Sequence, residues 1–215
     1  MTRAFTGLDP KRIAANLDRA RQQIADAGRD PSEVEILVAI KYVPVDELGA
    51  LAEAGVTVVG ENRAQDLIEK QERWGDAFEA WDFIGALQSR KVKDVAPRVR
   101  LIHSLASESA LRKLEANPAR EVLIEVNVAG EDSKAGIDPA DLGRFIEECP
   151  VPVGGLMCMP PFTDDPERSR PHFARLASLA TEHGLAKLSM GTSQDFAVAA
   201  AEGATIVRLG SSLFE

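Results

Sequence analysis

Cysteine, histidine and aromatic residues are scarce in this sequence. Its 215 residues include two Cys, three His and one Tyr, and only 5% are aromatic. Cys149 and Cys158 are too few for a disulfide framework, and their spacing is not that of a zinc site. His172 and His183 fall on one predicted helix and at its end, far along the chain from His103, so they form no plausible metal cluster. We expect no metal centre.

Long apolar runs and basic tracts are also absent. No run approaches the ~20 residues of a spanning helix, and the opening MTRAFTGLDPKR has no apolar core of a signal peptide. Lys and Arg number 25 against 34 Asp and Glu, which gives a net charge of −9. Binding to nucleic acid needs a basic face that neutralises phosphates. We therefore expect no membrane attachment, no nucleic-acid partner and a cytoplasmic location.

What the sequence does contain is a regular alternation of short apolar runs and helical segments. A length of 215 residues suits one domain, since domains typically have ~100 to 200 residues, so residues 1–215 are predicted to form a single domain. An extra helix leads the chain, with Asp9 as its N-cap, Pro10 at its first position and Gly28 as its stop signal. The apolar runs predict strands at 35–40, 56–60, 81–85, 99–104, 122–128, 151–157, 186–190 and 205–210.

Eight strands that alternate with helices indicate a parallel sheet covered by helices. Eight units favour a closed barrel, and we predict an α/β fold: a single (β/α)8 TIM-type barrel with an extra N-terminal helix. The alternative is an open doubly wound sheet, which periodicity alone does not exclude. No Gly-rich dinucleotide fingerprint follows any predicted strand, and this disfavours the open sheet.

Lys41 lies at the end of the first predicted strand. In EILVAIK, the residues Leu37, Ala39 and Lys41 share one side, which we assign to the barrel interior. Barrel enzymes carry their chemistry at this end of the strands. Partial desolvation would lower the pKa of Lys41 and free its amine to form a Schiff base with a carbonyl compound. The alternative is a lysine that reaches solvent or pairs with a carboxylate.

Three further polar residues lie near the ends of predicted strands. Glu125 faces inward in VLIEVNV, where it can pair with Lys41 either in a structural ion pair, which is the commoner outcome, or as a group that orients the lysine. Asn62 follows VTVVGE, where the alternative is a helix cap. His103 lies near the end of VRLIHS. A single histidine there is more often a buried core residue with its hydrogen bonds satisfied than a functional residue.

Two Gly- and Ser-containing loops follow the last two predicted strands. SMGTS at 189–193 and GSSLF at 210–214 place backbone N–H groups and hydroxyls where barrels often bind phosphate. Arg208 lies just before the second loop, where its guanidinium can meet a phosphate, a carboxylate or a ring nitrogen. Together with Lys41, these loops predict a phosphorylated aldehyde or ketone as ligand, and both pyridoxal 5′-phosphate (PLP) and a sugar phosphate fit that description.

The chain resembles the pyridoxal phosphate homeostasis proteins, the YggS/PROSC family, whose fold is similar to the barrel domain of alanine racemase. The resemblance covers nearly the whole chain and rests on VAIKYVP, VVGENRAQD, WDFIGALQSRKVK, LIHSLAS, EVNVAGEDSKAGI, GGLMCMPP and LSMGTSQDFAVAAAEGATIVRLGSSLF. Three positions depart from the family pattern. Asp82 replaces a His, Arg90 replaces an Asn, and Glu215 stands where Gly is usual, which puts any family role of the first two side chains in doubt.

The resemblance implies that PLP is held as a covalent aldimine on Lys41. It also implies a contact from Arg208 to the ring nitrogen. An arginine keeps its proton, so this contact would leave the ring nitrogen unprotonated and weaken the cofactor as an electron sink. The other residues implied to contact PLP are Asn62 and Met157 for the ring, and Ser189, Gly191, Thr192, Gly210 and Ser211 for the phosphate.

The function implied by the resemblance is intracellular PLP homeostasis, meaning storage, buffering or delivery to PLP-dependent apo-enzymes. We predict a monomer that is not an enzyme. The alternative is an amino-acid racemase, which needs proton donors on both faces of its substrate, whereas Lys41 serves one face. The single tyrosine, Tyr42, is predicted to point away from Lys41, and nothing favours His103 or Cys158 as the second acid. The sequence ends just after the eighth predicted strand, so we expect no second domain to supply that acid.

A third interpretation is a Schiff-base aldolase for sugar phosphates. It uses the same lysine and the same phosphate loops. The extent of the family resemblance disfavours it.

Overall fold

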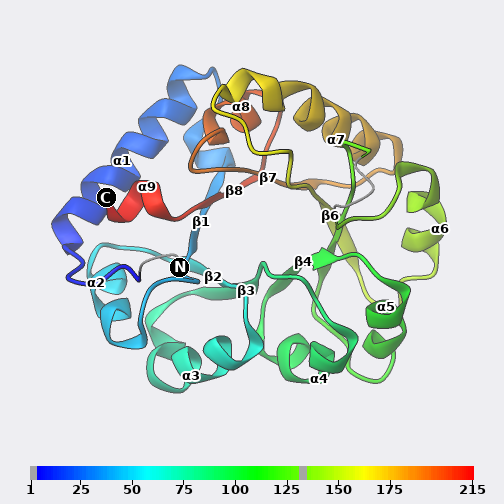
Figure 1. The fold of residues 1–215 in the computed structure, drawn as a ribbon, viewed down its shortest axis with the longest axis horizontal. Coiled ribbons are helices and arrows are strands. Elements are labelled where there is room, and N and C mark those ends of the chain that lie inside the picture. The colour runs from blue at the N-terminus through cyan, green and yellow to red at the C-terminus, as the bar shows by residue number, and fades with distance from the viewer. Residues whose placement is uncertain (1–3, 131–134) are drawn as a thin grey trace.

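Eight short strands rich in Val, Ile and Leu pair in parallel and close into a barrel (Figure 1). The computed structural model describes residues 4–130 and 135–215. The strands lie around the barrel in chain order, and the last pairs with the first. They are β1 (Glu35–Ala39), β2 (Val58–Glu61), β3 (Ala80–Phe83), β4 (Leu101–Leu105), β5 (Val122–Glu125), β6 (Val153–Met157), β7 (Lys187–Thr192) and β8 (Ile206–Leu209). The predicted (β/α)8 barrel is confirmed, and the open sheet is excluded.

The two faces of the strands carry different side chains. The inward face holds a small apolar core of Leu37, Val58, Ala80, Leu101, Leu123, Met157 and Ile206. The outward face packs against the helices in a much larger core that includes Val38 and Ile40. The predicted alternation along the first strand is therefore confirmed as far as β1 extends.

Helices surround the barrel (Figure 1). They are α1 (Pro10–Asp26), α2 (Leu48–Glu53), α3 (Ala64–Trp74), α4 (Val92–Val95), α5 (Glu108–Leu114), α6 (Leu142–Glu147), α7 (Arg170–Glu182), α8 (Phe196–Ala201) and α9 (Ser211–Phe214). Short 3-10 helices add to them at Pro31–Glu33, Val45–Glu47, Gly75–Ala77, Ser89–Lys91, Ala96–Arg98, Pro139–Asp141 and Pro166–Ser169. Among the residues that the structure describes, no helix is long and apolar enough to cross a membrane.

The extra helix α1 begins and ends as predicted. The Asp9 carboxylate accepts a hydrogen bond from the backbone N–H of Lys11 at 3.0 Å, and Gly28 adopts a φ of +85° just after the helix. Asn16 on the buried face of α1 donates to the carbonyl of Leu213 at 3.0 Å. This bond ties α9 to α1 and holds the segment that follows β8.

Seven of the eight strands are shorter than predicted, and β1 and β5 show how such strands end. β1 ends at Ala39 because the chain turns there, with the N–H of Val43 bonded to the carbonyl of Ile40 at 2.9 Å. β5 ends at Glu125, whose carbonyl accepts instead from the N–H of Ile137 at 2.7 Å. Residues 131–134, part of the quoted segment EVNVAGEDSKAGI, lie outside the described residues.

A close approach between the ends of β2 and β3 requires glycine at position 85. A Cβ atom added to Gly85 would lie 2.1 Å from the backbone oxygen of Asn62. We predict that Gly85→Ala lowers the free energy of unfolding by about 1–3 kcal/mol, because this backbone must move to admit the methyl group. The matched control is Gly75→Ala, whose Cβ meets nothing within 4 Å; its expected change is within about 0.5 kcal/mol. Urea unfolding measures both, and equal values for the two variants would contradict the prediction.

Candidate functional site

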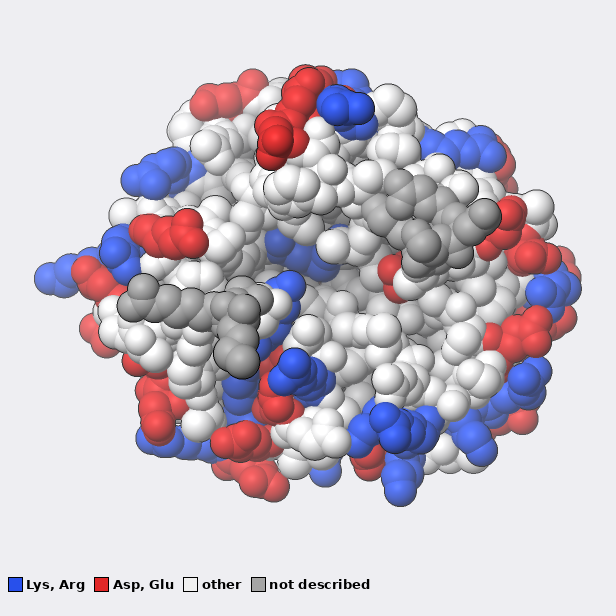
Figure 2. All heavy atoms as spheres, in the orientation of Figure 1, with Lys and Arg blue, Asp and Glu red and all other residues white. Residues whose placement is uncertain are grey.

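A pocket of about 330 Å³ lies at the carboxyl ends of the strands, and we call it the mouth pocket. Figure 2 shows the molecule hollowed at its centre, with basic side chains inside the hollow. Three lining residues lie in strands: Ala39 at the end of β1, Thr192 at the end of β7 and Arg208 in β8. The others come from the segments that follow β1, β2, β3, β6, β7 and β8. They are Ala39, Lys41, Asn62, Ile84, Gly85, Met159, Thr192, Ser193, Gln194, Arg208, Gly210 and Ser211.

Most of the residues predicted to form the site line this pocket. Lys41, Asn62, Thr192, Arg208, Gly210 and Ser211 are all among its walls. The other three predicted residues lie elsewhere: Met157 belongs to the inward core, Ser189 is fully buried, and Gly191 packs against α8. The barrel therefore brings together residues from both halves of the chain, as predicted.

Lys41 is exposed and lies beyond the end of β1. Its ammonium nitrogen is 5.0 Å from the centre of the Tyr42 ring, a cation–π contact. The prediction that Tyr42 points away from Lys41 is therefore wrong. The two-residue alternation of a strand stops at Ala39, and in the following turn neighbouring side chains lie together.

The predicted ion pair between Glu125 and Lys41 does not form among the described residues. Glu125 is buried on β5, and burial raises the pKa of its carboxyl group, while the positive charge of Arg208 opposes this rise. Within residues 4–130 and 135–215, Lys41 therefore has no carboxylate partner. Its amine is available to a ligand.

A buried ion pair holds the strand ends on which Lys41 and Asn62 lie. The ammonium of Lys70, on α3, lies 2.5 Å from the Glu61 carboxylate and also donates to the carbonyl of Ile40 at 2.8 Å. The same carboxylate accepts the backbone N–H of Asn62 at 2.6 Å. The Glu61–Lys70 pair therefore fixes the backbone just before Lys41 relative to that of Asn62.

Removing one partner of this pair would leave a buried charge without compensation. We predict that Lys70→Met lowers the free energy of unfolding by about 3–5 kcal/mol. The matched control is Arg73→Met on the same helix, because Arg73 pairs with Asp46 at an exposed position, where such pairs contribute about 0–1 kcal/mol. Denaturant unfolding of both variants tests the difference. A loss below 1 kcal/mol for Lys70→Met would contradict the assigned role.

Arg208 projects inward from β8 and is almost fully buried. Its Nη1 donates to the carbonyl of Ser189 at 2.7 Å and to the Ser189 hydroxyl at 2.6 Å. Its Nη2 donates to the carbonyl of Cys158 at 3.0 Å and contacts the sulfur of Met159 at 2.9 Å. These contacts hold the plane of the guanidinium in one orientation at the floor of the mouth pocket.

The two Gly- and Ser-containing loops are linked by Ser193. Its hydroxyl oxygen accepts from the backbone N–H of Gly210 at 3.2 Å and lies 3.0 Å from the Ser212 hydroxyl. In the first loop the backbone N–H of Thr192 donates to the Asp195 carboxylate at 2.8 Å. The loops thus meet at one side of the pocket and present their hydroxyls there.

The fold requires glycine at position 191 whether or not a ligand is bound. It adopts a φ of +88°, and an added Cβ would lie 2.6 Å from the Cβ of Ala199 and 2.9 Å from the Cα of Phe196. Glycine at this position therefore lets the chain turn closely onto α8.

Asn62 is not the helix cap that was considered as an alternative. The N-cap position of α3 is Arg63, and it makes no side-chain capping bond. The amide oxygen of Asn62 is buried and has no hydrogen-bond partner among the described residues. An unsatisfied buried polar atom is uncommon and marks a position that a ligand can satisfy.

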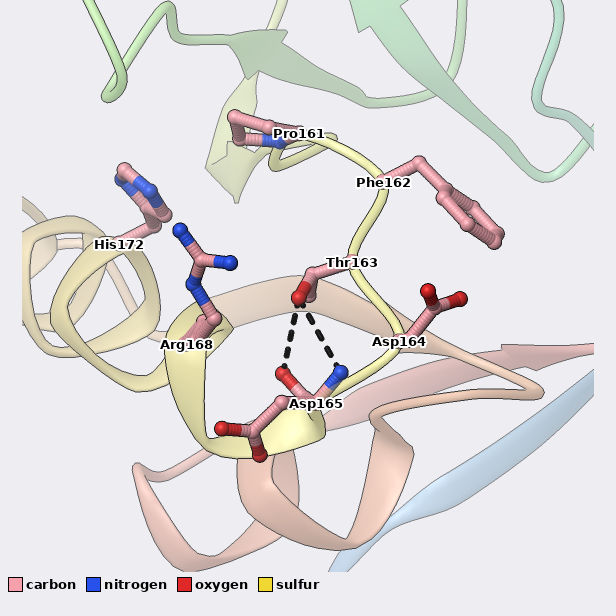
Figure 3. Close-up of a pocket in the computed structure, with 7 residues that line it drawn as sticks. All are labelled: Pro161, Phe162, Thr163, Asp164, Asp165, Arg168 and His172. Carbon is pink, nitrogen blue, oxygen red and sulfur yellow. Dashed lines mark hydrogen bonds between the residues drawn. The ribbon is translucent and has the colours of Figure 1, made fainter.

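The loop that follows β6 contributes Met159 to the mouth pocket. Farther along, residues 161–165 line a separate pocket together with Arg168 and His172 (Figure 3). Within this loop, the Thr163 hydroxyl accepts from the backbone N–H of Asp165 and donates to its carbonyl, both at 3.2 Å. Phe162 is 78% exposed, and its ring points away from Arg168 and His172. Residues 158–165 form no helix or strand.

Six residues that line the pocket were not among the predicted site residues: Ala39, Ile84, Gly85, Met159, Ser193 and Gln194. Ser193 lies inside the SMGTS segment, so its residue type and position already marked it. Gln194 is the next residue and carried no signal. Met157, which the resemblance implied as a ring contact, packs in the inward core, and Met159 lines the pocket instead.

His103 and Cys158, the two other acids considered for a racemase, do not line the pocket. His103 is fully buried, with Nδ1 at 2.8 Å from the Ser189 hydroxyl and Nε2 at 3.1 Å from Asp82. This confirms it as a satisfied core histidine. Cys158 packs in the outward core, and burial raises the pKa of its thiol to about 12. No cluster of His, Cys, Asp or Glu among the described residues could hold a metal ion.

Comparison with known proteins places the chain in a family. Residues 8–215 match the family described as alanine racemase, N-terminal domain. The chain belongs to this family. A pyridoxal phosphate homeostasis protein from Aquifex aeolicus is 42% identical over 219 residues, which cover 95% of this chain and 96% of that protein. The homologue of the same name from Escherichia coli is 33% identical over 224 residues, covering 94% and 95%. The chain therefore also belongs to the pyridoxal phosphate homeostasis protein family, as the resemblance implied.

Solved structures agree with this assignment. PipY from Synechococcus elongatus, described with PLP bound, superposes with a TM-score of 0.80 at 30% identity, covering 94% of this chain and 100% of that one. An alanine racemase from Clostridium difficile superposes with a TM-score of 0.70 at 13% identity, covering 96% of this chain and 57% of the racemase. At that identity the second comparison shows a shared fold alone.

Proposed function

We propose that the mouth pocket binds PLP through a Schiff base with Lys41, and that the protein acts in PLP homeostasis. The observation that carries this proposal is the joint position of Lys41 and Arg208 in the walls of one pocket. The names of the relatives and the PLP bound to PipY support it. Among the described residues, the amide oxygen of Asn62 has no hydrogen-bond partner and the ammonium of Lys41 has no carboxylate partner. Both groups also fit a ligand with polar ring substituents and an aldehyde.

Each wall of the pocket has a role in this proposal. PLP supplies an electrophilic aldehyde and an electron-withdrawing ring. Lys41 would hold the cofactor through its aldehyde carbon, with loss of water, and Arg208 would donate a hydrogen bond to the ring nitrogen without giving up its proton. Asn62 contacts the ring substituents.

The phosphate is proposed to lie between the two loops. Ser193 and Ser211 offer hydroxyls, and Thr192 and Gly210 shape the cradle. Ser189 and Gly191, which were predicted as phosphate contacts, have other roles in this proposal. The Ser189 hydroxyl accepts a hydrogen bond from Arg208, and Gly191 allows the chain to turn closely onto α8. Met157 stays beneath the pocket in the inward core and is not assigned a ring contact.

We infer a binding protein in preference to a racemase. A racemase needs a second acid opposite Lys41. Tyr42 lies beside Lys41, and His103 and Cys158 lie outside the pocket walls. We further expect PLP-dependent apo-enzymes as recipients of the cofactor.

Lys41 gives the direct test of cofactor binding. We predict that the protein turns yellow with PLP and that borohydride fixes the cofactor to Lys41, as shown by mass spectrometry of peptides. Lys41→Ala should lose the fixed label, whereas the exposed control Lys11→Ala should retain it. A colourless protein, or a label retained at full yield by Lys41→Ala, would refute the proposal.

The second prediction concerns catalysis. With PLP bound, the protein should invert free amino acids far more slowly than the turnover of about 1–10³ s⁻¹ typical of enzymes. Chiral chromatography of alanine and other amino acids measures the rate. Inversion at ordinary enzymatic turnover that disappears in Lys41→Ala would show that a second acid exists.

A further inference from the structure

A continuous set of polar groups leads from the half-buried Glu35 and Arg100 through the barrel interior to Arg208, and we call it the relay. It begins at Glu35, the first residue of β1, whose carboxylate oxygens accept two bonds from Arg100, each at 2.7 Å. Arg100 also donates to both carboxylate oxygens of Asp82, at 3.0 and 2.6 Å. Asp82 is fully buried on β3, so this paired carboxylate lies inside the barrel.

From Asp82 the relay continues to the mouth pocket. The Asp82 carboxylate is 3.1 Å from Nε2 of His103, and Nδ1 of the same ring is 2.8 Å from the Ser189 hydroxyl. That hydroxyl oxygen accepts from Nη1 of Arg208 at 2.6 Å. His103 and Ser189 are both fully buried, so solvent does not compete for these bonds.

The chemistry of the two ends sets the direction of every hydrogen bond between them. Arg208 can only donate, and an ionised Asp82 can only accept. Burial alone would raise the pKa of Asp82, but the bonds from His103 and Arg100 outweigh this and lower it, so the carboxylate is ionised. Burial lowers the pKa of His103, so its ring carries one proton.

One arrangement of protons satisfies all these groups. His103 carries its hydrogen on Nε2 and donates it to Asp82, so Nδ1 must accept the hydroxyl hydrogen of Ser189. The oxygen of Ser189 is then free to accept from Arg208. The Ser189 hydrogen is therefore committed to His103 and cannot serve a phosphate.

The bonds of Arg208 leave one guanidinium hydrogen for a ligand. Nη1 makes two bonds and Nη2 makes two contacts, and a guanidinium has five hydrogens. The remaining Nε–H has no partner among the described residues. Because the guanidinium is planar, the four contacts to Nη1 and Nη2 also fix the direction of Nε–H.

We propose that Asp82 and His103 are positioning residues which, through Ser189, orient Arg208 toward the ring nitrogen of PLP. This inference rests on the proposed function of the mouth pocket. Donors held in place by their own hydrogen bonds bind a ligand atom without reorganising. Neither residue touches the ligand, so their effect must appear only through the ring nitrogen.

The test variant is Asp82→Leu, which is close in shape to aspartate and removes both acceptor oxygens. A hydrogen on Nε2 of His103 would then be buried without an acceptor. The ring should therefore carry its hydrogen on Nδ1 and donate to Ser189, in competition with Arg208. Nitrogen-15 NMR of the apo protein should show the Nε2–H form of His103 in the parent protein and the Nδ1–H form in the variant.

Ligand binding gives the second measurement. We expect Asp82→Leu to weaken equilibrium binding of PLP about tenfold, the scale of one hydrogen bond to a charged group. Binding of 1-deaza-PLP, which has carbon in place of the ring nitrogen, should be the same in the parent and the variant. Ser189→Ala removes the hydroxyl that accepts from Arg208 but leaves the Asp82–Arg100 pair intact, and it should show the same selectivity for PLP. It also provides the test if Asp82→Leu does not fold.

The matched control is Glu121→Gln, which weakens the ion pair of Glu121 with Lys187 outside the relay. It should change neither the His103 proton position nor the binding of either ligand. Equal weakening of PLP and 1-deaza-PLP in Asp82→Leu or Ser189→Ala would overturn the inference, as would an Nδ1–H ring in the parent protein. A parent protein that binds neither ligand would instead contradict the proposed function, and the NMR measurement would still decide the direction of the relay.

Discussion

The buried guanidinium of Arg208 is the constraint on which the interior of this barrel depends. A charge inside a barrel is costly unless hydrogen bonds replace its lost water. Two backbone carbonyls, a hydroxyl and a sulfur surround this one. The inward core is accordingly apolar on one part of its lining and polar on another, where Ser189, His103 and Asp82 stand in place of the aliphatic side chains usual in such barrels.

The two sides of the mouth pocket are held by different means. On the β8 side, Arg208 is fixed through its own side chain, which has no freedom to move. On the β1 side, the Glu61–Lys70 pair fixes the backbone before Lys41 and leaves the lysine side chain exposed. This difference suits the proposed chemistry, because a hydrogen-bond donor benefits from a fixed direction, whereas an amine that attacks a carbonyl must reach its ligand and release it.

Much of this architecture was predictable from the sequence, because the period and number of apolar runs specify the barrel, and the barrel brings its strand ends together. Six of the nine predicted site residues line the pocket for that reason. The prediction for Tyr42 is wrong because it extended the strand alternation past Ala39, where the chain leaves the sheet. Met157 and Ser189 were implied as ligand contacts by the resemblance, and neither lines the pocket. The position of Ser189 in the segment SMGTS does not show which hydrogen bonds its hydroxyl already makes.

Buried polar partners separated by many residues were beyond sequence reasoning. Nothing in the sequence pairs Arg100 with Glu35 or links His103 to Ser189, since these contacts depend on how the barrel closes. Asp82 is the instructive case, because it was noted as a departure from a family pattern that has histidine. A histidine can donate or accept at either nitrogen, so it would leave the relay without a set direction. An ionised aspartate bonded to Arg100 can only accept hydrogen bonds, so His103 must donate to it. His103 then accepts from the Ser189 hydroxyl, whose oxygen accepts from Arg208 at the pocket floor.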